Sequence, residues 1–415
     1  MTASGHRRAF FYVDDLPQPG RSGANLRFWS NLHGFLDRGF EVGLIDFASG
    51  AADPGLPGVR WTHVAAPPGR AGIVSRLFYR AGFAARPACD YYCPRAPAVR
   101  REVAARVRAF PDAVHVFEGE NISSSLIGLG RIRSVWSCHE VPSQSLAGVN
   151  RAARDLQGRP LRAPQIRQER FARSLERRVA ARCGLVLCIT LEDAARMQTL
   201  WRCPRAEFLP TSVADLPAAL PERPWMPDGV LRLLHLGALT HLPSFRSLEF
   251  LLERVFPRLP EAARDRIRLT VAGRSDATSP RAAKILALMR RYPQVSYVGY
   301  VEDLEAAYRD ADLQVVVSTD ATGLRTRIVE SFAFGLPVLT TSVASRGIDG
   351  LEAGANVLVA DDAASIAGLL CRPLESPDLL ARLAAEARRT YDARYSRAAV
   401  ASRLAELLAR HFGVS

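Results

Sequence analysis

The sequence has almost no lysine. Of its 55 basic residues only Lys284 is a lysine, and 42 acidic residues leave a formal net charge of +13. A pI near 10.0 raises the question of a nucleic-acid or membrane partner. Because arginine is abundant together with alanine, proline and glycine, we attribute this charge to GC-rich codon usage. No arginine-rich tail with interleaved aromatic residues is present, which argues against nucleic-acid binding.

The chain also lacks a metal-binding cysteine pattern and any long apolar run. Its seven cysteines are scattered, and Cys89 and Cys93 have no second pair at zinc spacing. We expect buried thiols in a reducing compartment. No run of 18 apolar residues and no apolar signal core are present. We therefore expect a cytoplasmic protein, with peripheral contact to the inner membrane face as an alternative.

Strand and helix patterns alternate along the whole chain. Residues 8–13, 25–38 and 39–47 predict a strand, a helix and a strand, joined by a glycine-containing loop without GxGxxG. The alternation restarts after residues 211–229, a proline-rich stretch that predicts a linker. With 415 residues and 48% hydrophobic content, the chain is predicted to form two α/β domains with a cleft between them.

The stretch 318–341 carries the clearest functional pattern. An apolar strand, a loop with glycine and a helix follow one another, and such a helix N-terminus is an anion site. Arg325 and Arg327 add guanidinium groups, and Glu330 lies about one turn further on. The arginines suit phosphates and the carboxylate suits ribose hydroxyls. The alternative is an ordinary surface ion pair between Arg327 and Glu330.

The order of these pieces resembles a GT-B glycosyltransferase, and it is most similar to the large retaining family 4 (glycosyl transferases group 1). The resemblance covers nearly the whole chain and rests on residues 233–244, 269–274, 298–301 and 323–338. It implies an α/β fold of two Rossmann-like domains facing a cleft, with the C-terminal helix crossing back to the N-domain. The implied segments are an acceptor-side domain at 1–210 with 392–415, a linker at 211–229, and a donor-binding domain at 230–391.

The resemblance also assigns roles to single residues. Glu330 would bind the donor ribose, Arg325 and Arg327 would neutralise the diphosphate leaving group, and His139 would lie near the sugar. The alternative for His139 is a loop cap with no catalytic part. The implied catalytic residues are His139, Arg325 and Arg327, and the implied donor-binding residues are Gly23, Gly237, Arg246, Arg274, Val301, Thr322, Gly323, Leu324, Thr326 and Glu330. No metal and no cofactor are expected, since the nucleotide sugar is a substrate.

Two departures from the family pattern stand out. Thr322 lies eight residues before Glu330, where the family usually has a Glu that contacts the sugar. We expect this change to alter sugar recognition rather than abolish transfer. The basic residue expected after Gly237 has no clear equivalent. Arg246 and Arg274 are the candidates, although both could be solvated surface charges.

The predicted function is retaining, metal-independent transfer of a sugar from a nucleoside-diphosphate sugar to a hydroxyl or other nucleophile of a small-molecule or glycan acceptor. One alternative is a membrane-face transferase with a lipid-linked or polysaccharide acceptor, because the arginine-rich helices within 76–108 and 151–182 could lie on anionic lipid. The other interpretation of these arginine-rich helices is that they are ordinary solvated helix surfaces. A sugar-nucleotide epimerase would need an acid/base set, which His139 and Glu140 only suggest. A donor-binding protein without catalysis is the last alternative.

Overall fold

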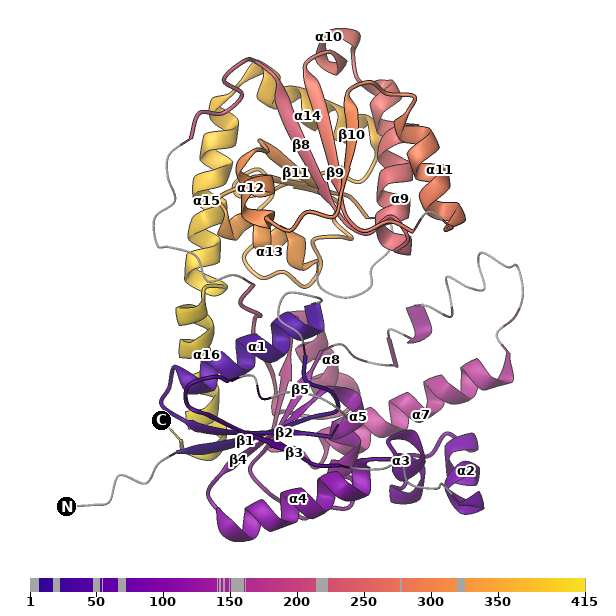
Figure 1. Ribbon diagram of the computed structural model, residues 1–415, viewed down its shortest axis with the longest axis vertical. Coiled ribbons are helices and arrows are strands. Elements are labelled where there is room, and N and C mark those ends of the chain that lie inside the picture. The colour runs from indigo at the N-terminus through magenta and orange to yellow at the C-terminus, as the bar shows by residue number, and fades with distance from the viewer. Residues whose placement is uncertain are drawn as a thin grey trace, which may run out of the picture. The chain divides into compact units, whose positions relative to one another are not determined.

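The chain forms two units, each built on one parallel sheet (Figure 1). The computed structural model describes residues 7–17, 23–47, 53, 55–65, 72–139, 141, 143–144, 146–148, 150, 160, 162–213, 223–276, 278–318 and 325–414. The first unit comprises Met1–Ser212 and Arg397–Ser415, and the second comprises Val213–Ser396.

The N-terminal unit holds a seven-stranded sheet in the order β3-β2-β1-β4-β5-β6-β7, with every pair parallel. Its strands are β1 (Arg8–Val13), β2 (Glu41–Asp46), β3 (Val59–His63), β4 (Val114–Glu118), β5 (Ser134–Cys138), β6 (Leu185–Cys188) and β7 (Ala206–Phe208). Its helices are α1 (Gly23–Leu36), α2 (Ile73–Arg80), α3 (Arg86–Tyr92), α4 (Ala96–Ala109), α5 (Gly119–Ser123), α7 (Ala163–Ala180), α8 (Leu191–Leu200) and α16 (Arg397–Phe412). The central strands β4, β5 and β6 are buried on both faces. Strand β6 is entirely apolar, while β4 and β5 also bury polar side chains: His115, Glu118, Ser134 and Ser137.

The C-terminal helix returns to the first unit, as the resemblance implied. In α16, Val400, Leu404 and Leu407 share a core cluster with Phe28 and Leu32 of α1. Their spacing of three or four residues places them on one face of the helix. The returning helix is thus part of the N-terminal core.

Helix α1 also holds the two places where the chain leaves and re-enters this unit. The guanidinium of Arg27 donates from Nη1 to the carbonyl oxygens of Leu209 (2.6 Å) and Pro210 (3.1 Å). At the other end of α1, Asp37 pairs with Arg397, the first residue of α16, at 2.6 Å. Arg27 is completely buried, and burial lowers its pKa to about 10.

The C-terminal unit holds a six-stranded parallel sheet in the order β10-β9-β8-β11-β12-β13. Its strands are β8 (Leu231–Leu236), β9 (Ile267–Ala272), β10 (Val295–Gly299), β11 (Leu313–Val316), β12 (Val338–Thr340) and β13 (Leu358–Val359). Its helices are α9 (Leu242–Phe250), α10 (Glu261–Arg264), α11 (Pro280–Met289), α12 (Leu304–Arg309), α13 (Thr326–Ala333), α14 (Ala363–Glu375) and α15 (Asp378–Arg394). Helix α9 continues as a π-helical turn (Leu251–Val255) and a 3-10 turn (Phe256–Arg258), where Pro257 has no N–H to extend the α-helical ladder.

Two further findings bear on the sequence predictions. All seven cysteines carry free thiols, and every one except the half-buried Cys371 is buried. Among the residues that the structure describes, no helix is both long and apolar enough to cross a membrane. The α/β class and the two Rossmann-like sheets are confirmed.

Candidate functional site

The site in the C-terminal unit is organised around the carboxylate of Glu330 on α13. Its Oε2 accepts one hydrogen bond from Nη1 of Arg327 at 2.7 Å and another from Oη of Tyr308 at 2.9 Å. Tyr308 belongs to α12, and its ring stacks on Phe334 with a centroid distance of 4.6 Å. Glu330 is buried, so the pair with Arg327 differs from a solvated ion pair on a helix surface.

Burial and charge act against each other in this cluster. Burial disfavours the charged form of Arg327, yet the neighbouring Glu330 and Tyr308 together raise its pKa. Burial also raises the pKa of Tyr308 well above its ordinary value, and the negative charge of Glu330 adds to the shift. Tyr308 therefore stays a neutral donor that fixes the carboxylate, while Arg327 stays a cation.

The N-terminus of α13 supplies the second part of the site. Arg325 is the N-cap residue of this helix, and its Nη2 donates to Oγ of Ser318, which follows β11, at 3.1 Å. Thr326 begins the helix, whose first N–H groups have no partner within it. The predicted donor-binding residues Thr322, Gly323 and Leu324 lie outside the described residues. The described part thus combines a helix N-terminus, two guanidinium groups and one fixed carboxylate.

The neighbouring strand ends approach each other more closely than side chains would allow. The N–H of Gly237, just after β8, donates to the carbonyl of Ala272 at the end of β9 (2.9 Å). Gly273 has φ +156, and a Cβ added there would lie 2.0 Å from the carbonyl oxygen of Gly237. A Cβ at Gly237 would lie 2.3 Å from Oγ of Ser244. Close backbone packing therefore accounts for glycine at position 273, and the side chain of Ser244 accounts for glycine at position 237.

Sequence reasoning overlooked His235, although it lies in one of the matching segments. Its side chain is buried in β8, and Nδ1 lies 3.2 Å from the carbonyl oxygen of Val315. Burial lowers its pKa to about 4, and the positive charge of Arg327 contributes to the shift. His235 is therefore neutral, with Nδ1–H as the donor to Val315. Its Nε2 has no hydrogen-bond partner among the described residues.

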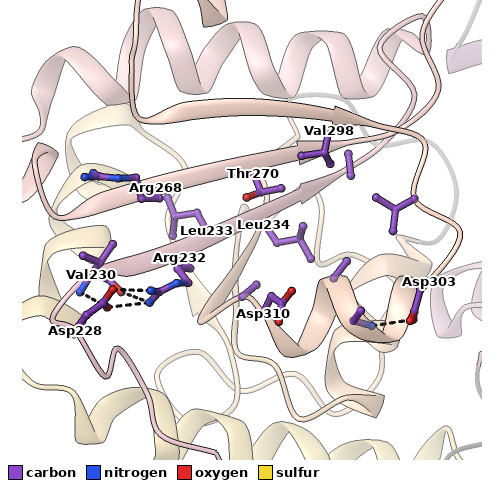
Figure 2. A pocket seen from close by; sticks show the side chains of 15 residues that line it. Asp228, Val230, Arg232, Leu233, Leu234, Arg268, Thr270, Val298, Asp303 and Asp310 are labelled. Atoms are coloured by element: carbon purple, nitrogen blue, oxygen red, sulfur yellow. Dashed lines mark hydrogen bonds and ion pairs between the residues drawn. The ribbon is translucent and has the colours of Figure 1, made fainter.

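The other predicted donor-binding residues of this unit include Val301, which packs against the apolar cluster that contains Tyr308. Arg274 is exposed, and its guanidinium carbon lies 4.6 Å from the ring centroid of Tyr300. Arg246 lies half-buried on α9. Val301 lines a groove of 820 Å³ on the sheet face formed by β8, β9 and β10 beside α12. Figure 2 shows this groove between the Asp228–Arg232 ion pair at one end and Asp303 at the other.

The N-terminal unit contains a second buried carboxylate, Glu118, at the end of β4. Its Oε2 lies 2.9 Å from Nε2 of His139, the residue after β5. Its Oε1 accepts from Nδ2 of Asn31 at 3.2 Å, and the same Asn31 nitrogen donates to Ser137 at 2.9 Å. His139 is thus held by a carboxylate and is not a simple loop cap. The signal that could have revealed Glu118 is an acidic residue at a strand end.

Two more predictions concern this unit. Gly23 is the first residue of α1, which begins directly after residues outside the described ranges. Glu140, the suggested partner of His139 in an epimerase, also lies outside them. In the described chain the acidic partner of His139 is therefore Glu118.

Comparison with known proteins identifies the fold and the class of enzyme. Residues 231–376 match the family described as glycosyl transferases group 1. Among solved structures, sucrose-phosphate synthase from Thermosynechococcus elongatus is similar in fold. The alignment covers 99% of this chain and 100% of the synthase chain, at 15% sequence identity and a TM-score of 0.69. The chain therefore has the GT-B fold, and its residues 231–376 match the group 1 glycosyl transferases. A search of curated proteins finds no match.

Two further solved structures share the fold of this chain. The first is Anabaena HepE in complex with UDP and glucose. The alignment covers 97% of this chain and 100% of the HepE chain, at 15% sequence identity and a TM-score of 0.65. The second is an E. coli structure described as trehalose-6-phosphate bound with UDP-2-fluoro glucose. The alignment covers 96% of this chain and 98% of that chain, at 12% sequence identity and a TM-score of 0.62. The group 1 match contains Tyr308, Arg327 and Glu330 but neither Glu118 nor His139.

Proposed function

We propose that this glycosyltransferase transfers a sugar, with retention and without a metal ion, from a nucleoside-diphosphate sugar to a hydroxyl of a small-molecule or glycan acceptor. The observation that carries the proposal is the cluster at α13: Arg325 and Arg327 beside the helix N-terminus, with Glu330 fixed by Tyr308. Two proteins of this fold, Anabaena HepE and the E. coli protein, have been solved with UDP or a UDP-sugar bound, so uridine is the first nucleoside to test.

The reaction needs positive charge where negative charge develops. As the bond between the anomeric carbon and the diphosphate oxygen breaks, its electron pair moves to the leaving diphosphate. The guanidinium groups of Arg325 and Arg327 and the N–H groups of α13 would stabilise that charge. The carboxylate of Glu330 would accept hydrogen bonds from the ribose hydroxyls and so position the donor.

Retention requires the acceptor to attack from the face that the diphosphate leaves. The acceptor oxygen forms the new bond to the anomeric carbon, and its proton passes to an oxygen of the leaving phosphate. No side-chain nucleophile is needed for this step. We place His139 near the transferred sugar, with Glu118 as the residue that orients its ring.

The test compares Glu330→Ala and Arg327→Ala with Glu386→Ala. Glu386 pairs with Arg389 at the same i,i+3 spacing on the exposed surface of α15, so it is a matched control for the loss of an ion pair. We expect about a 100-fold or greater loss of transfer in the first two variants and wild-type transfer in the control. NMR of the product shows whether the anomeric configuration is retained, and added EDTA shows whether a metal takes part.

Three results would overturn the proposal. If the Glu330→Ala variant keeps wild-type turnover, the donor does not bind at α13. Inversion at the anomeric carbon would contradict the mechanism. Conversion of the donor into its epimer without an acceptor would indicate an epimerase instead.

A further inference from the structure

Helix α2 turns its apolar residues away from the protein. Ile73, Val74, Leu77 and Phe78 recur at the spacing that places them on one helix face, and they are 79%, 58%, 59% and 38% exposed. Helix α2 has no buried residue. A surface helix of a globular protein normally buries such a face, so this one needs a partner.

The opposite side of α2 makes the contact with the rest of the unit. Tyr79 packs its ring on Phe171 of α7 and on Tyr91 of α3, with centroid distances of 4.7 Å and 5.0 Å. In Figure 1, α2 lies beside α3 at the edge of this unit. The helix is therefore anchored through Tyr79 while its apolar face stays exposed.

The exposed face extends beyond the helix. Phe83 is 41% exposed, and its ring lies 6.2 Å from that of Phe78. We call Ile73, Val74, Leu77, Phe78 and Phe83 the apolar stripe. Its aromatic end is suited to the boundary between lipid headgroups and acyl chains.

The charge within the segment that carries the apolar stripe is of one sign. Residues 72–89 contain three arginines and no acidic residue. Arg76 and Arg80 of α2 are exposed, and neither forms an ion pair with another described residue. Apolar side chains flanked by unpaired arginines match a surface that is apolar inside and negatively charged outside.

We propose that the apolar stripe docks the protein on the surface of a bilayer that contains anionic lipids. Charge complementarity favours this partner over a second copy of the chain. A symmetric dimer through α2 would gather Arg76 and Arg80 of both copies in one interface, and the chain already carries a net charge of +13. This inference goes beyond sugar transfer and does not depend on which acceptor the enzyme uses.

Vesicle sedimentation of the full chain tests the proposal. The vesicles contain phosphatidylcholine alone or phosphatidylcholine mixed with phosphatidylglycerol, each at low and high salt. We expect binding to the mixed vesicles that weakens at high salt. Leu77→Asp should lower the bound fraction by about fivefold or more, and the double variant Arg76→Glu with Arg80→Glu should abolish the preference for the mixed vesicles.

The matched control is Leu200→Asp at the end of α8. Leu200 is 61% exposed, close to the 59% of Leu77, but it lies outside the apolar stripe. This variant should bind vesicles as the wild type does, and both variants should keep the wild-type melting temperature and response to UDP. That response is independent of membrane binding, so it separates failure of this inference from failure of the donor site.

Four results would overturn the inference. The first is a wild-type protein that binds neither kind of vesicle, and the second is a Leu77→Asp variant that binds as the wild type does. The third is a melting temperature lowered in Leu77→Asp but not in Leu200→Asp, which would show that the chain itself covers the stripe. The fourth is a concentration-dependent dimer, detected by light scattering and lost in Leu77→Asp, which would show that a second copy covers it.

Discussion

The two units each hold a buried carboxylate with a nitrogen donor, but the two pairs are built differently. In the C-terminal unit, Arg327 and Glu330 are three residues apart on one helix. In the N-terminal unit, His139 and Glu118 come from the ends of two neighbouring strands. The first pair joins a guanidinium cation to its carboxylate, while the second joins an imidazole ring to its carboxylate.

This difference separates what a binding site needs from what a reacting site needs. A diphosphate is always an anion, so a fixed guanidinium suits it. A transferred sugar presents neutral hydroxyls, so an imidazole whose ring is held in place by a carboxylate suits its surroundings. We therefore predict that the C-terminal pair governs affinity for the donor and that the N-terminal pair positions the transferred sugar.

The largest expected effect comes from replacing each carboxylate by its amide. Glu330→Gln removes a charge that fixes Arg327 and meets the ribose, so kcat/KM should fall by about 100-fold with clearly weaker nucleotide binding. Glu118→Gln leaves the donor site intact, so kcat should fall by about tenfold with unchanged nucleotide affinity. Calorimetry with UDP and steady-state kinetics measure both.

The opposite pair of results would contradict the roles predicted for the two carboxylates. If Glu118→Gln weakens nucleotide binding while Glu330→Gln does not, the roles of the two units are exchanged. Circular dichroism of both variants shows whether the fold survives, so that an unfolded variant is not mistaken for an inactive one.

A third carboxylate, Glu176 in α7, shows what happens without a basic partner. Its donors are the backbone N–H and the hydroxyl of Ser143, both neutral, and burial raises its pKa from 4.5 to about 7. Between these values the unfolded chain has released the proton while the native chain keeps it. Stability from this group is therefore complete below pH 4.5 and is lost as the pH rises towards 7.

Glu176→Gln should remove this pH dependence. The difference between the wild type and the variant in the free energy of unfolding should change by about 2–3 kcal/mol between pH 4.5 and pH 7. Urea unfolding at several pH values measures it. Parallel curves for the two proteins across that range would show that Glu176 does not keep its proton in the native state.

The smallest expected effect concerns the hydroxyl that fixes Glu330. Tyr308→Phe removes one of the two donors to Oε2, so stability should fall by about 1 kcal/mol and UDP should bind roughly fivefold more weakly. Tyr292→Phe is the matched control, because it removes a hydroxyl bonded to the carbonyl of Leu252 instead. The control should lose similar stability without any change in UDP affinity. Equal UDP affinities in both variants would show that Tyr308 does not position the carboxylate for the nucleotide.

The sequence predicted the fold well because its signals are local. Apolar runs predicted the central strands, and three- and four-residue spacings predicted most helices. It missed β3 and β7, which lie at the two edges of the sheet. Edge strands are shorter or half-exposed, so their residues lack the continuous apolar pattern of a central strand.

The residues of the candidate site were likewise predictable only where the sequence signal is local. The sequence alone singled out Arg325, Arg327 and Glu330 because these three charged side chains lie within six consecutive residues. Tyr308 is 22 residues from Glu330, and Glu118 is 21 residues from His139. Only the fold brings such partners together, since parallel strands end at the same edge of a sheet. The assignment of roles to these residues stays a prediction that the variants above can test.

Helix α1 is in mechanical contact with both connections between the two units. Through Arg27 it holds the segment that leaves the N-terminal unit, and through Asp37 it holds the helix that returns. Arg403 and Arg410 add further contacts of the returning helix, to Glu207. A force that displaces α1 would act on both connections at once, and a substitution at Arg27 can loosen one of them without altering a residue that we expect to meet substrate.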